Sequence, residues 1–185
     1  RAYPARSAVG VVNKKTAMIE TLTALMQQFP GETVDVTSIS KDGKRAIVAV
    51  YSDVNPGEFF LFDRESKKLS GILKRAEKIN PDQMASMEPI KLKSRDGLDL
   101  NGYLTRPLGQ EQGKNLPLVV YVHGGPFDVR DYWGYDRYVQ MLASRGYAVL
   151  QVNFRGSGGY GAAFEVAGYR QWGGAMQDDV TDATK

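Results

Sequence analysis

The chain has 185 residues, 42% of them hydrophobic, which suffices for one domain or for two small or incomplete ones. Its 24 basic and 21 acidic residues interleave, so the net charge of +3 gives no indication of a nucleic-acid partner. The absence of cysteine excludes disulfides and thiolate metal sites, whereas the cellular compartment and the oligomeric state stay open. Since no apolar run approaches the roughly 20 residues of a membrane helix, we expect no membrane segment.

An amphipathic helix over residues 13–29 is the first predicted element. Asn13 can cap its start, and Pro30-Gly31 can end it. Its hydrophobic side chains recur at helical spacing on one face: Met18, Leu22, Leu25, Met26 and Phe29. Such a stripe is typical of core packing, so we expect no cofactor or partner role for it.

Four short β-type runs follow between Thr33 and Leu73, namely VDVTSIS, RAIVAVYS, EFFLFD and KLSGIL. Turn residues separate them: Asp42-Gly43 predicts a two-residue hairpin loop, and Asn55-Pro56-Gly57 predicts a turn. Four consecutive antiparallel strands have the size of one β-propeller blade, which needs neighbouring blades to bury both faces. We therefore expect a blade whose neighbours precede this chain. The alternative is a small meander that belongs to the same domain as the residues after it.

The pattern changes after a polar, helix-compatible linker over residues 74–87, which places a domain boundary near Ala85. A second hairpin is predicted around Arg95-Asp96-Gly97. Beyond it, the apolar runs LPLVVYV and YAVLQVNF alternate with predicted helices at 138–145 and 172–185. Continuous apolar runs of this kind are typical of parallel strands that helices cover on both faces. The second module is thus predicted to begin as an α/β sheet.

The segment YVHGGP, residues 121–126, carries the clearest chemical signal because it lies at the end of a predicted buried strand. In α/β-hydrolases, a strand-to-helix loop of this kind contributes a backbone N–H to the oxyanion hole, which binds the negative oxygen of a tetrahedral intermediate. Adjacent glycines such as Gly124 and Gly125 let the backbone approach that oxygen without a Cβ in the way. The alternative is an ordinary glycine turn after a strand.

His123 is the only histidine of the chain, so a Ser-His-Asp triad within these residues would need it as the base. Hydrolase triads place the histidine after the serine and the acid, and we instead expect His123 to order its loop by hydrogen bonding. No Gly-x-Ser-x-Gly occurs in the sequence, and the nearest candidate, Ser157, lacks the first glycine. The nucleophile is therefore expected to lie outside these residues.

Two competing interpretations arise from nearby residues. Residues 156–161 satisfy the G-x-G-x-x-G spacing of a dinucleotide site, but Gly168 interrupts the next helical stretch and no strand ending in an acid comes about 20 positions later. Asp178, Asp179 and Asp182 invite a metal or paired-carboxylate site. However, no further ligand residues lie nearby in the sequence. Acidic residues at the start of a helix usually interact with the helix dipole and with solvent. We therefore predict neither a cofactor nor a metal.

Four motifs after residue 90 form a specific combination: RDGLDLNGYL at 95–104, HGGP at 123–126, NFRGSGGYG at 153–161 and WGGAMQDD at 172–179. By these motifs, residues 91–185 resemble the start of the catalytic domain in prolyl oligopeptidase-family serine peptidases, especially the acylaminoacyl-peptidase-like branch. The resemblance implies an α/β fold, in which one four-stranded β-propeller blade precedes the N-terminal part of an α/β-hydrolase sheet. On this basis residues 1–84 would end a propeller domain, and residues 85–185 would form the N-terminal half of a peptidase catalytic domain.

The resemblance also implies roles for single residues. The N–H of Gly125 would point into the oxyanion hole, and Gly124, which has no Cβ, would leave room for the oxygen. Asn153, Arg155 and Tyr160 would shape the floor of the substrate site, although Arg155 could equally tie the glycine loop to a carboxylate. The catalytic serine, aspartate and histidine would all lie downstream of the matching segment.

The function implied by the resemblance is hydrolysis of short peptides through an acyl-enzyme by the whole protein. The chain alone would then be inactive, and its expected partner is a peptide substrate. Two other classes stay open: an esterase or lipase on the same fold, and a binding module that has no catalytic serine.

Overall fold

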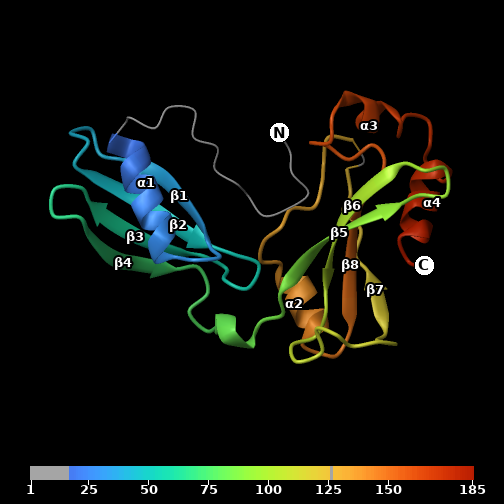
Figure 1. Cartoon of the computed structure of the whole chain (residues 1–185), viewed down its shortest axis with the longest axis horizontal. Coiled ribbons are helices and arrows are strands. Elements are labelled where there is room, and N and C mark those ends of the chain that lie inside the picture. The colour runs from blue at the N-terminus through green and yellow to red at the C-terminus, as the bar shows by residue number, and fades with distance from the viewer. Residues whose placement is uncertain (1–16, 126) are drawn as a thin grey trace. The chain divides into compact units, whose positions relative to one another are not determined.

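The computed structural model describes residues 17–125 and 127–185, and these form two compact units (Figure 1). One unit consists of Ala85–Trp133 and Arg137–Lys185, and the other extends to Met84 and includes Gly134–Asp136. None of the described helices is long and apolar enough to span a membrane.

The N-terminal unit holds one helix and a four-stranded antiparallel sheet. Its elements are α1 (Ala17–Gln28), β1 (Thr33–Ile39), β2 (Arg45–Tyr51), β3 (Glu58–Asp63) and β4 (Lys68–Lys74). The strands pair in the order β1-β2-β3-β4, so the predicted meander is confirmed. The helix ends just before Pro30-Gly31, as expected, whereas the predicted cap Asn13 lies outside the described residues.

The first hairpin departs from its predicted two-residue loop. Ser40 and Arg45 still pair, because the Ser40 N–H donates to the Arg45 carbonyl at 2.9 Å, and the loop therefore takes residues 41–44. Asp42 accounts for the longer loop: its carboxylate accepts from the Ser40 hydroxyl at 2.6 Å and from the Lys44 N–H at 3.0 Å. Gly43 then adopts the left-handed conformation, with φ at +70°.

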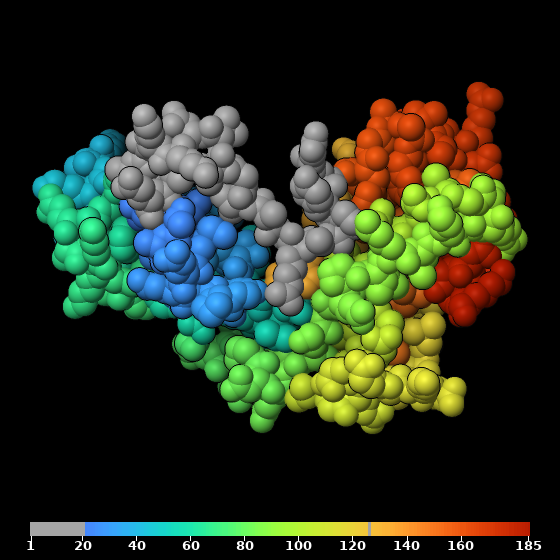
Figure 2. All heavy atoms as spheres, in the orientation of Figure 1, coloured from blue at the N-terminus to red at the C-terminus, as the bar shows by residue number. Residues whose placement is uncertain are grey.

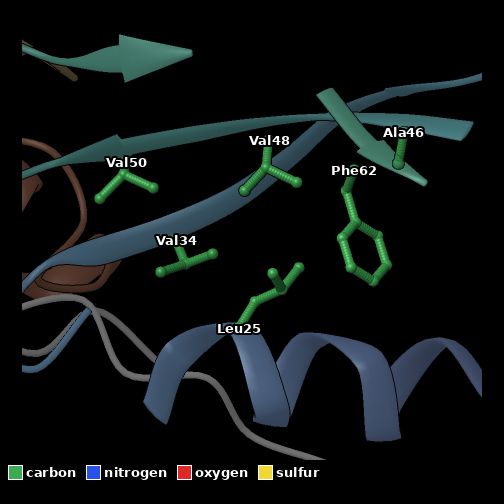
Figure 3. Close-up of a cluster of buried hydrophobic side chains, with 6 residues drawn as sticks. All are labelled: Leu25, Val34, Ala46, Val48, Val50 and Phe62. Carbon is green, nitrogen blue, oxygen red and sulfur yellow. The ribbon is translucent and has the colours of Figure 1, made fainter. Parts of the chain in front are cut away.

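The core of this unit lies between α1 and one face of the sheet. Figure 3 shows Leu25 of α1 close to Val34, Val48 and Phe62 of the sheet. Leu25 is 2% exposed and Val48 is fully buried, and Leu22, Met26 and Phe29 pack around this cluster. The hydrophobic stripe is thus confirmed as core packing, with the side chain of Met18 outside the described residues.

The second unit holds a mixed sheet with three helices among its described residues. Downstream of the linker's 3₁₀ turn η1 (Pro81–Gln83), its elements are β5 (Met87–Lys93), β6 (Asp99–Thr105), β7 (Leu118–Val120), α2 (Arg137–Ala143), β8 (Ala148–Asn153), α3 (Ala162–Val166) and α4 (Ala175–Asp182). The sheet order is β5-β6-β8-β7. Only the β7/β8 pair is parallel, since β5/β6 and β6/β8 are antiparallel.

β8 is an inner strand of this sheet and is buried at all six of its residues. Burial of side chains on both of its faces favours the largely apolar run seen in the sequence, although Gln151 and Asn153 are buried there too. The predicted parallel pairing is therefore confirmed for β7 and β8. The C-terminal helix α4, red in Figure 2, lies against the loop between β5 and β6, where the Arg95 N–H donates to Asp182 at 2.7 Å.

Candidate functional site

The candidate site lies where β7 and β8 end. These strands are parallel neighbours, so their carboxyl ends lie at the same edge of the sheet. The loop after β7 begins at Tyr121, and the loop after β8 begins at Phe154. In open α/β sheets, ligands bind outside the carboxyl ends of the strands, which makes this edge the candidate site.

Gly125 adopts a backbone conformation that other residues rarely take, with φ at +146°. A Cβ built on it would lie 2.8 Å from the Val129 Cβ, so a side chain would also clash. The residue is exposed, and its N–H donates to no acceptor within residues 17–125 and 127–185. Gly124 differs, because a Cβ there would meet nothing within 4 Å. Pro126, which completes the segment, lies outside the described residues.

His123 is held between the two loops. Its Nδ1 lies 2.9 Å from the Gly124 carbonyl oxygen, and its Nε2 lies 2.9 Å from the Ser157 Oγ. The imidazole also stacks on Phe154, with ring centroids 4.6 Å apart and planes inclined by 14°. These contacts confirm that His123 orders its loop by hydrogen bonding. Ser157 is 0% exposed, so its hydroxyl cannot reach a substrate.

Arg155 binds two carboxylates that lie far from it in sequence. Its Nε and Nη2 donate to Asp179 at 2.8 and 2.7 Å, and its Nη1 and Nη2 both donate to Asp96 at 2.8 Å. The backbone N–H of Arg155 donates to Asp179 as well, at 2.9 Å. The Asp179 side chain is 0% exposed and that of Arg155 is 9% exposed. Arg155 thus ties the loop after β8 to α4 and to the β5–β6 loop, which is the structural alternative considered for it.

Hydrogen bonds shift the pKa values of the charged groups around this arginine. The pKa of Arg155 is raised, chiefly by its hydrogen bonds to Asp179 and then by those to Asp96. The pKa of Asp96 is held well below its usual range by hydrogen bonds from Arg155 and then from the Ser94 hydroxyl. The pKa of Asp182 is lowered too, chiefly by Arg95. Arg155, Asp96 and Asp182 are therefore all charged at neutral pH.

The acidic residues of α4 pair with arginines, which corrects the expectation that they serve only the helix dipole and solvent. Arg95 bridges Asp178 at 2.9 Å and Asp182 at 3.0 Å, and Asp179 is the buried partner of Arg155. The described part of the chain contains no group of three or more potential metal ligands.

Asn153 and Tyr160 form a second link between the two loops. The Asn153 Oδ1 accepts from the Asp131 N–H at 2.8 Å, and its Nδ2 donates to the Asp131 carbonyl at 3.1 Å and to the Tyr160 hydroxyl at 2.7 Å. Asn153 is fully buried, and burial raises the pKa of Tyr160. The structure therefore brings the predicted substrate-binding residues Asn153, Arg155 and Tyr160 to one edge of the sheet. Their contact with a substrate stays a prediction.

An aromatic pocket beside the loop after β7 was not predicted. It is lined by Phe127, Tyr169, Arg170 and Trp172. The Phe127 ring centroid lies 4.9 Å from that of Tyr169 and 6.3 Å from that of Trp172, and Trp172 is 71% exposed. Trp172 belongs to the WGGAMQDD motif. Its ring lies near that of Phe127 only in the folded chain, so a local sequence pattern could not predict this contact.

Comparison with known proteins identifies the family. Residues 133–185 match the model of the prolyl oligopeptidase family. Dipeptidyl aminopeptidase BIII of Pseudoxanthomonas mexicana is 39% identical over 84% of this chain and 23% of its own length. The structure of Pyrococcus horikoshii acylaminoacyl peptidase is 25% identical with a TM-score of 0.59, over 80% of this chain and 23% of that one. An acylaminoacyl peptidase in complex with Z-Gly-Gly-Phe-chloromethyl ketone has a TM-score of 0.60 at 25% identity, over the same shares of the two chains.

The chain thus spans about a quarter of the length of these relatives, as the shares of 23% show. The structural matches confirm the predicted fold class, in which a four-stranded antiparallel sheet of propeller type precedes an α/β-hydrolase sheet. Its motifs, its fold and these matches together show that the chain belongs to the prolyl oligopeptidase family.

Proposed function

We propose that the protein to which this chain belongs is a serine peptidase, and that this chain supplies one donor of its oxyanion hole. The observation that carries the proposal is the Gly125 N–H, which has no acceptor among the described residues. Gly125 follows β7, the third strand of the α/β sheet in chain order. α/β-Hydrolases take one oxyanion donor from the loop after their third strand and the other from the residue after the nucleophile.

The nucleophile, the acid and the base are proposed to lie outside these 185 residues. The sequence has no Gly-x-Ser-x-Gly, Ser157 is buried, and both ring nitrogens of the single histidine have partners. The chain also spans only 23% of the length of dipeptidyl aminopeptidase BIII. Residues 85–185 would then form the N-terminal half of a catalytic domain, residues 1–84 would end a propeller domain, and the chain alone would be inactive.

Short peptides are the proposed substrates. In support, one relative bears the name of a dipeptidyl aminopeptidase, and one structural neighbour holds a peptide-derived chloromethyl ketone. The aromatic pocket at Phe127 and Trp172 offers an apolar surface next to the Gly125 loop, which suits a substrate side chain. Asn153, Arg155 and Tyr160 would serve the site by holding its two loops in place.

The test compares amides with an ester, using the longer protein that contains this chain. We expect turnover of glycyl-phenylalanyl p-nitroanilide with a higher kcat than that of phenylalanyl p-nitroanilide, because binding energy from a remote subsite lowers the barrier at the reacting carbonyl. An esterase or lipase would cleave p-nitrophenyl butyrate and leave both anilides intact. A binding module would cleave none of the three.

A further inference from the structure

We propose that Ser157 and His123 act as a positioning relay that sets the direction of the Gly125 N–H. The inference deepens the proposed function, since it gives that N–H a reason to face the oxyanion. It assigns a role to Ser157, a buried hydroxyl 34 positions from the histidine that it contacts. Neither residue touches the substrate, so both are positioning residues.

The peptide between Gly124 and Gly125 connects His123 to the proposed oxyanion donor. The carbonyl of Gly124 and the N–H of Gly125 belong to the same planar, trans peptide, so they point in opposite directions. The carbonyl accepts a hydrogen bond from His123 at 2.9 Å. When the imidazole holds the carbonyl toward itself, the N–H must point away from the imidazole. The direction of the proposed oxyanion donor is therefore set by His123.

This peptide needs to be held because its own residues restrain it little. Two glycines in succession carry no Cβ on either side of the peptide, so the unit can rotate at little steric cost. A Cβ on Gly124 would meet nothing within 4 Å, so packing does not restrain the Gly124 side of the peptide. The contact with His123 is the one hydrogen bond that the Gly124 carbonyl accepts from the described residues. Without it, the peptide is expected to sample both orientations.

The Gly124 carbonyl and the Ser157 hydroxyl together favour one tautomer of His123. A carbonyl oxygen can only accept, so the Nδ1 must carry the hydrogen. In a neutral imidazole the Nε2 is then an acceptor, and the Ser157 hydroxyl at 2.9 Å is the group that donates to it. Ser157 is 0% exposed, and its backbone N–H is fixed on the Phe154 carbonyl at 3.0 Å. A hydroxyl can donate as well as accept, so the Nδ1–H form is the one neutral tautomer in which the imidazole holds both Gly124 and Ser157.

The first test reads the tautomer directly. Because the chain has a single histidine, a long-range ¹H–¹⁵N spectrum of the 185-residue chain contains one imidazole. We expect the Nδ1–H form in the unmodified chain and a mixture of the two tautomers in Ser157→Ala, with Ser157→Cys in between because a thiol is a weaker donor. The matched control is Ser144→Ala, since Ser144 is exposed and its hydroxyl donates to the Met141 carbonyl at 2.8 Å. An unchanged Nδ1–H form in a folded Ser157→Ala chain would overturn the relay.

The second test reads the effect on catalysis in the longer protein. Loss of one oxyanion donor lowers kcat by about 10²–10³-fold, and a donor that is present but free to turn should cost less, about tenfold. We expect Ser157→Ala to show that loss in kcat with KM unchanged, and Ser144→Ala to show none. A loss confined to KM would contradict the relay. If the unmodified longer protein cleaves no anilide, the proposed function fails, whereas the tautomer measurement still decides the relay.

Discussion

Replacement of Asp179 by asparagine is expected to lower the free energy of unfolding of the second unit by about 3–5 kcal/mol. Asp179 is 0% exposed and accepts three hydrogen bonds from Arg155, one of them from its backbone N–H. Removal of one charge from a buried pair leaves the other charge uncompensated. Asp96 still pairs with Arg155 in this variant, but its side chain is 52% exposed, so it offsets only part of the loss.

The neighbouring Asp178→Asn variant is the matched control. Asp178 pairs with Arg95, but the two side chains are 45% and 48% exposed, so its loss should cost within about 1 kcal/mol. Both tryptophans, Trp133 and Trp172, lie in this unit, and urea unfolding followed by their fluorescence therefore reports on it. Equal, small losses for the two variants would show that the buried ion pair does not stabilise the unit.

The second large effect is expected at Gly125. In the longer protein, Gly125→Ala should lower kcat for a peptide anilide by about 10²–10³-fold, as loss of an oxyanion donor does. Alanine rarely adopts a φ of +146°, and its Cβ would lie 2.8 Å from the Cβ of Val129, so the loop must move and take the N–H with it. Initial-rate kinetics measure the loss.

Gly109→Ala is the control for strain alone. Gly109 also has a positive φ, +78°, but a Cβ there would meet nothing within 4 Å and the residue lies in the loop between β6 and β7. We expect a small loss of stability and an unchanged kcat for this variant. A Gly125→Ala protein that is as active as the Gly109→Ala protein would show that the Gly125 N–H contributes nothing to catalysis.

Local patterns predicted most of the fold. The four strands of the N-terminal unit followed from β-type runs between turn residues, and β8 followed from its continuous apolar run. The helix α3 was missed because it has only five residues, between Gly161 and Gly168, which is too short for a periodic pattern. The loop at Asp42 was predicted too short because the side-chain contacts of Asp42, not the Asp-Gly pair alone, decide its length.

The sequence predicted only those parts of the site whose residues are neighbours in the chain. The segment at residues 123–126 indicated an oxyanion loop because adjacent glycines have a chemical reason to be there. The partners of Arg155 lie 59 and 24 residues away, at Asp96 and Asp179, and Asp179 was expected to face solvent. The contact of His123 with Ser157 was also missed, because only the parallel pairing of β7 and β8 brings their loops together.

Labelling with a serine-directed fluorophosphonate tests the central claim most directly, since the claim is that these residues provide an oxyanion donor but no nucleophile. We expect the 185-residue chain to stay unlabelled and the longer protein to take one label per molecule, on a serine outside this chain. Mass spectrometry of the labelled peptide identifies that serine. Stoichiometric labelling of the 185-residue chain itself, at Ser157 or at any other serine, would contradict the claim.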